Sequence, residues 1–250
     1  MSGHSKWSTI KHKKAKTDAQ RGKVFSKIIK EITVAARMGG GDETANPALR
    51  TAVASAKAVN MPSANIERAI KKGTGELEGV SYDQICYEGY GPGGSALMID
   101  ALTDNKNRTV AEIRHLLSKN NGNLGENGCV AWIFEKKGVI TVKAEKISED
   151  ELFELVLEAG ADDMQNEDDF YEIVTQPTAF EQVKNALAEK QIECESAELT
   201  MHPKNTVNVN EKEAEQLLRL MDALEDHEDV THVYSNFDID TEILKKLDQD

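Results

Sequence analysis

Cysteine is scarce in this chain of 250 residues, which contains only three. Cys86, Cys129 and Cys194 lie far apart and form no CxxC pair, so neither a disulfide framework nor a zinc knuckle is expected. The six histidines form no HxxxH or HExxH spacing, and no cysteine lies within metal-ligand spacing of one. The sequence therefore predicts no metal site, and its cysteine usage fits a reducing cytosol.

Long apolar runs are also missing. No stretch approaches the ~18 apolar residues that mark a bilayer-spanning helix, and residues 1–16 are polar and basic without the apolar core of a signal peptide. We therefore expect a cytoplasmic protein with no membrane partner. Hydrophobic residues still make up 39% of the chain, which is enough for packed cores.

Catalytic signatures are absent as well, since the chain has no Gly-x-Ser-x-Gly element and no Cys/His pairing. The segment Gly89–Gly94 matches GxGxxG, but Pro92 occupies the turn and a strand-like run follows where a nucleotide site needs a helix. We expect a tight turn with positive φ at several glycines. The acidic cluster around Asp168 fits a solvated hairpin turn, and a hydrolase that uses it stays as an alternative. No enzymatic activity and no cofactor are predicted.

The charge of the chain is divided unevenly, although its net value is −14. Residues 1–75 carry 15 Lys or Arg and 5 Asp or Glu, a net charge of +10. The remaining 175 residues carry 15 Lys or Arg and 39 Asp or Glu, a net charge of −24. A basic module of this density attracts polyanions, whereas an acidic remainder repels phosphate and keeps the molecule soluble.

Three helices are expected in the basic part. Asp18 can cap the first, which has apolar residues at steps of three and four and ends at the three glycines 39–41. Asn46 followed by Pro47 opens a second helix through Val59. Ser63 caps a third, which stops at Lys71-Lys72-Gly73.

Strand and helix signals alternate beyond residue 95. Four capping-box patterns predict helix starts, at Thr109/Glu112, Ser148/Glu151, Thr178/Glu181 and Asn210/Glu213. Strand-like segments separate these helices, at 96–102, 130–134, 139–142, 170–174, 197–201 and 230–234, with short strands near 162–166 and 206–209.

This order predicts a multidomain protein of α and α+β class. Residues 138–202 complete one βαββαβ unit, and the segments that flank it form the two halves of another. We expect a basic helical nucleic-acid-binding domain at 1–78, a discontinuous α+β domain at 79–136 and 204–240, and an inserted α+β domain at 137–203. The alternative is two consecutive α+β domains that meet near Gly160.

The basic N-terminus carries the strongest functional signal. A cation recurs every two or three positions, and the lead-in before residue 18 has almost no apolar stripe to bury, which favours phosphate binding over a solvated lysine face. The predicted nucleic-acid-binding residues in this part are His4, Lys6, Trp7, Lys11, His12, Lys13, Lys14, Lys16, Arg21, Lys23, Lys27 and Lys30. Trp7 stacks on a base or packs in the helical core.

A second, weaker basic group starts at a loop and continues along the helix predicted at 109–120. It consists of Lys106, Asn107, Arg108, Arg114 and Lys119, of which Arg108 and Arg114 are predicted contacts. It is either a second contact or plain surface. The signature of an RNA recognition motif is absent, so the alternating Val130, Trp132 and Phe134 are expected in the core. No helix-turn-helix recognition helix is identified, and base-specific readout is not predicted.

Several segments closely resemble the YebC/PmpR family of regulators. They are Gly3-His-Ser-Lys-Trp7, Arg21-Gly-Lys-x-Phe25, Gly39-Gly-Gly-Asp42, Asn60-Met-Pro62, Tyr87-Glu-Gly-Tyr-Gly-Pro-Gly-Gly94, Thr103-Asp-Asn105 and Asn107-Arg-Thr109. The resemblance covers essentially the whole chain. It implies three domains, one helical and two ferredoxin-like.

The resemblance implies DNA as the partner, because family members are described as DNA-binding transcriptional regulators. It also implies an alternative, a ribosome-associated translation factor that binds ribosomal RNA, because mitochondrial relatives act in translation and bacterial ones are linked to relief of ribosome stalling. Both functions need phosphate binding by the basic end, and phosphate contacts do not select the polymer. The acidic domains remain available for a protein partner, and a monomer is expected.

Overall fold

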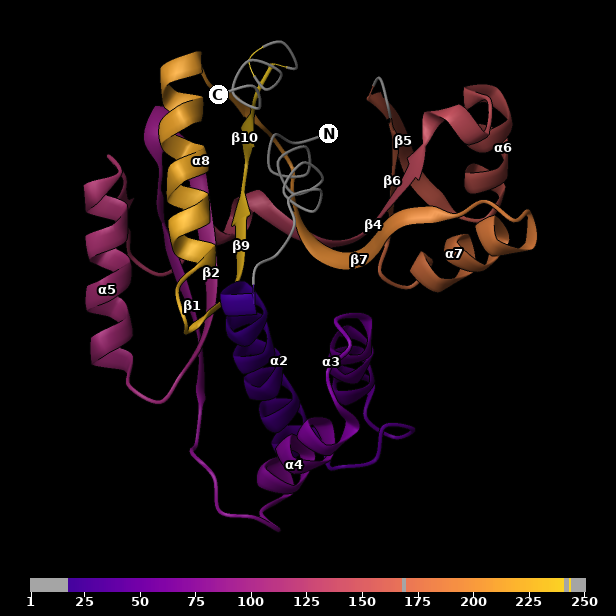
Figure 1. The fold of residues 1–250 in the computed structure, drawn as a ribbon. Coiled ribbons are helices and arrows are strands. Elements are labelled where there is room, and N and C mark those ends of the chain that lie inside the picture. Colours follow the sequence, from indigo (N-terminus) through magenta and orange to yellow (C-terminus); the bar gives the residue numbers. More distant parts are fainter. Residues whose placement is uncertain (1–17, 168–169, 241–242, 244–250) are drawn as a thin grey trace.

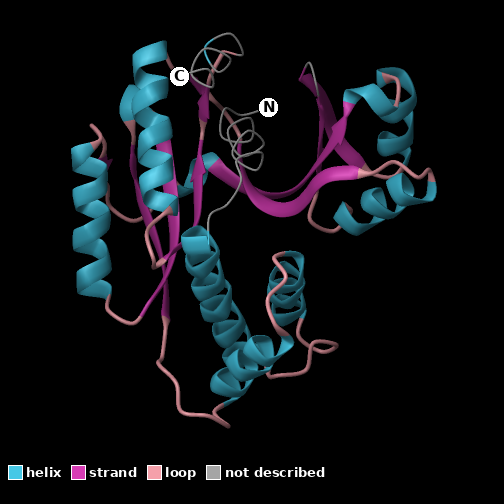
Figure 2. Ribbon diagram, in the orientation of Figure 1, coloured by secondary structure: helices cyan, strands magenta, loops and turns pink. Residues whose placement is uncertain are grey.

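The computed structural model describes residues 18–167, 170–240 and 243. Figure 1 shows a bundle of helices and two sheets, each with helices packed on one face. The strands belong to the two upper bodies in Figure 2, and the bundle below them is helical. Among the described helices, none combines the length and the apolar character needed to cross a bilayer.

The helical body consists of α2 (Asp18–Gly39), α3 (Pro47–Ala58) and α4 (Ser63–Thr74). All three helices that the sequence predicts are confirmed, but the predicted Ser63 cap is wrong, because Ser63 is the first residue of α4 and Pro62 holds the cap position without a side-chain bond. The side chain of Asn46 caps α3 by accepting the Leu49 N–H at 3.1 Å, as the Asn-Pro pair indicated. The core of this body contains Ile32, Leu49 and Val53, which are fully or almost fully buried.

Gly73 sets how closely α4 approaches α2. A Cβ atom at this position would lie 2.5 Å from the Thr33 carbonyl oxygen and 2.7 Å from the Ala36 Cβ. Both distances are below van der Waals contact, so only glycine permits this helix crossing. The face of α4 that meets α2 is therefore fixed, and the opposite face points outward.

The first sheet is antiparallel and has the strand order β3-β1-β2-β9. Its strands are β1 (Asp83–Tyr90), β2 (Ala96–Thr103), β3 (Asn123–Leu124) and β9 (Val230–Ser235). Helices α5 (Lys106–Lys119) and α8 (Glu211–Glu225) pack on one face, where Leu97 and Ile99 join their apolar stripes. Gly93 and Gly94, in the turn between β1 and β2, have φ values of 68° and 74°, which confirms the predicted tight turn.

The second sheet is also antiparallel and has the order β5-β6-β4-β7. Its elements follow one another along the chain as β4 (Phe134–Lys143), α6 (Glu149–Glu158), β5 (Ala161–Glu167), β6 (Phe170–Thr175), α7 (Phe180–Glu189) and β7 (Cys194–Pro203). Strand β9 of the first sheet follows all of them. A parallel pair of short strands, β8 (Val207–Asn208) and β10 (Phe237–Asp238), completes the fold.

The predicted strand at 130–134 is wrong, and β1 was missed. Residues Ala131–Ile133 form a 3-10 turn instead. The cause is the buried carboxylate of Glu88 in β1, which accepts backbone N–H groups from Gly128 at 2.6 Å and from Val130 and Ala131 at 2.8 Å each. This distant residue bends the chain before β4 begins.

The bend also changes the environment of the three alternating apolar residues. Val130 and Phe134 are buried, as predicted, whereas Trp132 is 65% exposed. Its indole N–H donates to the Cys129 carbonyl at 3.0 Å. The prediction of a core position is therefore wrong for Trp132.

The capping-box predictions were correct only in part. Asn210 and Glu213 form the full reciprocal box at the start of α8. Ser148 precedes α6, but its hydroxyl bonds the Glu151 carboxylate and no backbone N–H. The other two patterns are wrong, because Asn105 caps α5 and α7 begins at Phe180 without a side-chain cap.

We predict that Glu88→Ala lowers the free energy of unfolding by about 2 to 3 kcal/mol, because three backbone N–H groups lose a charged acceptor. Burial opposes ionisation of Glu88, but the three N–H groups outweigh it and lower its pKa. A lowered pKa in the folded state means that this contribution is present above about pH 4.3 and is lost as the pH falls below it. Urea unfolding at pH 7 and pH 3 measures both effects. The exposed Glu126→Ala is the control, and an equal loss in both variants would contradict the assignment.

Candidate nucleic-acid interface

Most of the predicted lead-in contacts fall outside the described residues. This applies to His4, Lys6, Trp7, Lys11, His12, Lys13, Lys14 and Lys16. Arg21 lies in α2, but its side chain is not among those described. For these nine residues nucleic-acid binding stays a prediction.

The described lysines of α2 contact the acidic end of α8. Lys23, Lys27 and Lys30 are spaced at i, i+4 and i+7, so they share one face of the helix. Lys23 pairs with Asp226 at 3.2 Å, and Lys27 donates to the carbonyl oxygen of Glu225. The last carbonyls of a helix have no acceptor role within it and carry partial negative charge. The lysine stripe of α2 therefore binds the C-terminal end of α8.

Lys30 is the innermost of the three and is only 7% exposed. Its Nζ donates to the Glu228 carbonyl at 3.1 Å and to Asp229 Oδ1 at 2.8 Å. It also lies 5.6 Å from the centre of the Tyr82 ring. The structure thus gives Lys30 a different role from the predicted one, because its charge is used to hold the helical body against the first sheet.

Asp229 is the acceptor at the centre of this interface. Its buried carboxylate also receives Arg108 Nη2 at 2.7 Å and the Thr109 hydroxyl at 2.8 Å, both from α5. Burial disfavours the charged form, but the bonds from Lys30, Arg108 and Thr109 outweigh it and hold the pKa of Asp229 well below its usual range. Arg108 further pairs with Asp104 at 3.0 Å. Arg108 thus forms internal ion pairs while its side chain is 43% exposed, and its phosphate contact stays a prediction.

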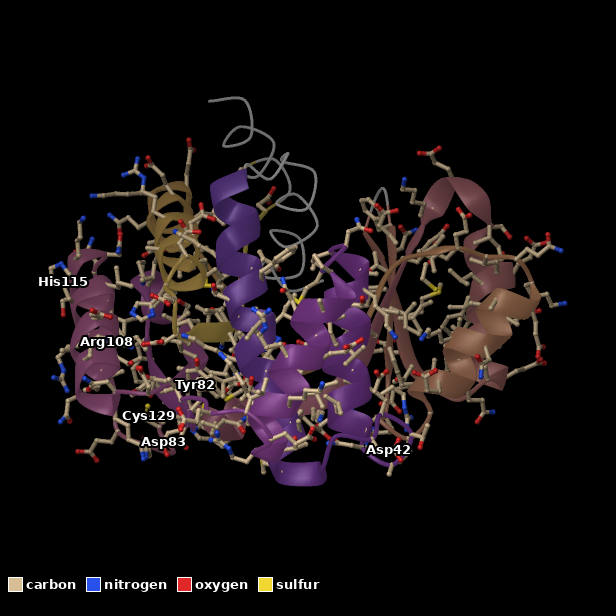
Figure 3. The ribbon with its side chains drawn as sticks, turned by 60° about the horizontal axis from the view of Figure 1, so that its bottom comes forward. Asp42, Tyr82, Asp83, Arg108, His115 and Cys129 are labelled. Carbon is tan, nitrogen blue, oxygen red and sulfur yellow. The ribbon has the colours of Figure 1, made fainter. Side chains whose placement is uncertain are left out.

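The remaining predicted contact, Arg114, lies exposed on α5, and no ion pair or hydrogen bond of its side chain is found within the described part of the chain. In Figure 3 the labels Arg108 and His115 mark α5, at the left edge of the view. Asp42, which follows α2, lies well to the right of it. Arg108 and Arg114 therefore differ in their availability, although the sequence grouped them together.

Folding brings Glu112, His227 and Asp229 together, with ligand atoms within 4.8 Å of one another. Their hydrogen bonds already use these atoms. His227 Nδ1 accepts the Asp229 N–H at 3.1 Å, which leaves Nε2 to donate to Glu112 Oε2 at 2.8 Å. These hydrogen bonds connect α5 to the segment after α8, next to the Lys30–Asp229 pair.

The three cations of α4 were not among the predicted contacts. Arg68, Lys71 and Lys72 lie on α4, with Arg68 and Lys71 exposed and Lys72 half-buried. In the sequence, Lys71 and Lys72 served only as a signal for the helix end. The i, i+3 and i+4 spacing of the three was the available signal that they share a face.

We predict that Asp229→Asn lowers the free energy of unfolding by about 3 to 5 kcal/mol at pH 7, because Lys30 would remain buried without its partner. The exposed pair gives a matched control, since Asp226→Asn should cost about 1 kcal/mol or less. The pKa of Asp229 is depressed in the folded state, so its contribution is present above about pH 3.9 and decreases as the pH falls below that value. Urea unfolding of both variants across pH 3 to 7 tests this. Equal effects at all pH values would argue against the ion cluster.

The sequence and fold match known families and structures. Residues 5–76 match the model of the TACO1/YebC protein N-terminal domain, and residues 82–237 match that of the TACO1/YebC second and third domain. A protein of Syntrophobacter fumaroxidans named "Probable transcriptional regulatory protein" is 62% identical, covering 99% of this chain and 100% of the relative. A Geobacter sulfurreducens protein, named as a probable transcriptional regulatory protein, is 60% identical with the same coverage.

A solved structure has a similar fold. The crystal structure of a conserved hypothetical protein, Aq1575 from Aquifex aeolicus, has a TM-score of 0.80 and 51% identity, covering 94% of this chain and 97% of that one. The matched models together take in both the basic helical part and the two sheets. The resemblance found in the sequence motifs is thereby confirmed, and the chain belongs to the TACO1/YebC family.

Proposed function

We propose that this protein regulates gene expression by binding nucleic acid through its N-terminal domain, as a DNA-binding transcriptional regulator in the cytoplasm. The observation that carries the proposal is the lead-in at residues 1–17, which contains five lysines and no acidic residue. A segment of this charge binds phosphates and releases their counterions. The names of the relatives, probable transcriptional regulatory proteins, support the same conclusion.

The docking of α2 explains how such a lead-in would be presented. Lys23 and Lys30 attach α2 to Asp226 and Asp229, so the helix is a fixed platform and residues 1–17 precede its first turn. The acidic remainder of the chain repels phosphate and favours orientations in which the basic end meets the nucleic acid first. Phosphate contacts of this kind position the protein and carry no base sequence information.

We propose that the protein acts without catalysis. Among the described residues, the carboxylates with clearly lowered pKa values that are also buried, Glu88 and Asp229, are held in hydrogen-bond networks within the fold. Cys86 is exposed at the surface, but partial desolvation of its thiol and the nearby Asp100 raise its pKa to about 12, so the thiol is a poor nucleophile at neutral pH. Asp168, on which the hydrolase alternative depends, lies outside the described residues.

We also propose that the second sheet and its helices form a ferredoxin-like domain inserted into the other α+β domain. The order β4-α6-β5-β6-α7-β7 along the chain and β5-β6-β4-β7 across the sheet support this. The elements around the first sheet follow a different order, because the hairpin of β1 and β2 precedes α5. The first sheet does not follow the ferredoxin-like pattern, because β8 pairs with β10 outside this sheet and β1 lies between β2 and β3.

The first test of this function is the salt dependence of binding. Changing Lys11, Lys13 and Lys14 together to Ala should flatten the slope of log K against log salt by ~2 to 3 units on a DNA duplex, because each phosphate contact contributes ~0.9. All sequences should be weakened about equally. An unchanged slope in this variant would show that the lead-in is not the binding segment.

Trp7→Ala tests which polymer is bound. If Trp7 stacks on an unpaired base, the change should cost ~1 to 3 kcal/mol on a looped RNA and little on a DNA duplex. A core role would lower folding stability with no preference between the two. Trp132→Ala, at an exposed tryptophan of the acidic part, is the matched control. A binding defect confined to RNA would favour the alternative function, a translation factor that binds ribosomal RNA, over transcriptional regulation.

A further inference from the structure

Helix α4 carries three cations on the face that points away from the helical core. Ile66 and Ala69 pack inward, and positions 68, 71 and 72 lie on the opposite side, at helical steps of three and four residues. The aliphatic stem of Lys72 packs against Gly79. A Cβ atom added to Gly79 would lie 3.2 to 3.4 Å from the Cβ, Cγ and Cδ atoms of Lys72. Figure 1 shows α4 at the end of α2 that is remote from α8.

These cations differ from the lysines of α2 in their partners. Lys23 and Lys30 are each paired with an aspartate of the α8–β9 region. By contrast, no ion pair or hydrogen bond of the Arg68, Lys71 or Lys72 side chains occurs among the described residues. The helical body therefore uses Lys23 and Lys30 internally, whereas Arg68 and Lys71 are exposed to solvent and Lys72 is half-buried.

A purely structural role explains only part of this pattern. Lys71 and Lys72 lie in the last turn of α4, where cations interact favourably with the helix dipole. Arg68 lies before that turn, and its charge repels those of Lys71 and Lys72 at i+3 and i+4. These three like charges form no ion pair within the described part of the chain, and the phosphates of a bound polyanion would supply counter-charges that relieve their repulsion.

We propose that Arg68, Lys71 and Lys72 form a second phosphate-binding site for nucleic acid, separate from the lead-in. This inference rests on the proposed nucleic-acid-binding function and adds to it a site on a described helix. Gly73 packs against Ala36, which lies 18 residues after the start of α2. At 1.5 Å per residue the site is about 27 Å along α2 from the point where the lead-in joins it. A nucleic acid that touches both ends spans roughly eight phosphates of one strand.

The test is the triple change Arg68→Ala, Lys71→Ala and Lys72→Ala in the full chain, with binding measured to a 20-base-pair DNA duplex and to a 20-nucleotide RNA hairpin. Loss of three contacts should flatten the salt slope on duplex by ~2 to 3 units and weaken binding about 100-fold near 0.15 M salt. A loss of less than twofold with an unchanged slope overturns the proposal. The polymer that shows the larger loss identifies the source of the phosphates.

Two control variants separate local contacts from net charge and from folding. Changing Lys136, Lys190 and Lys212 to Ala removes the same charge from exposed positions of the acidic domains and should leave the slope unchanged. The charge-conserving triple Arg68→Lys, Lys71→Arg and Lys72→Arg should bind as the parent does. If the alanine triple loses stability, Arg68→Gln alone, outside the last turn, should still flatten the slope by ~0.9.

The lead-in variant, measured in the same series, distinguishes the two proposals. A parent chain that binds, a lead-in variant that does not, and an α4 triple that binds normally would overturn the α4 site and leave the proposed function intact. If the parent chain binds neither probe at any salt concentration, the proposed function fails and the α4 site fails with it. Flattened slopes in both variants support both sites.

Discussion

The buried carboxylate of Asp229 is the point at which three parts of the chain meet, and its charge requires them to stay together. Lys30 reaches it from α2, Arg108 and Thr109 reach it from α5, and Asp229 itself follows the end of α8. Taking a carboxylate out of water costs several kcal/mol unless cations and hydrogen-bond donors replace the solvent. The orientation of the helical body on the first sheet follows from this requirement, and with it the direction in which both the lead-in and α4 face.

The basic character of the N-terminal part therefore serves two purposes that net charge alone does not distinguish. The lysines of α2 neutralise an acidic helix end inside the protein, where Lys23 and Lys27 bind Asp226 and the Glu225 carbonyl. The cations of α4 have no such partner among the described residues and remain accessible to an external polyanion. The charge difference between residues 1–75 and residues 76–250, +10 against −24, thus contributes to assembly of the domains as well as to recognition.

Elements with strong local signals were predicted from sequence, and elements shaped by distant contacts were not. Asn46-Pro47 at α3 and the Asn210/Glu213 box at α8 involve bonds within three residues, and both predictions are confirmed. The segment before β4 has an alternating pattern typical of a strand, yet Glu88, about 40 residues earlier, binds its backbone and bends it. Thr109 has the sequence of a helix cap, but its hydroxyl bonds Asp229, 120 residues away.

The sequence by itself determined the family, the three helices of the basic part and the division of charge near residue 75. It also determined the absence of recognised catalytic motifs. Each of these depends on residue type and short spacing. Only the tertiary structure decided which cations are free. Lys30 and Arg68 are indistinguishable in a count of charges, but one faces a buried aspartate 199 positions later and the other faces solvent. The physical reason is that an ion pair depends on distances in space, and the residue that removes Lys30 from the surface is brought to it only when the helical body docks on the first sheet.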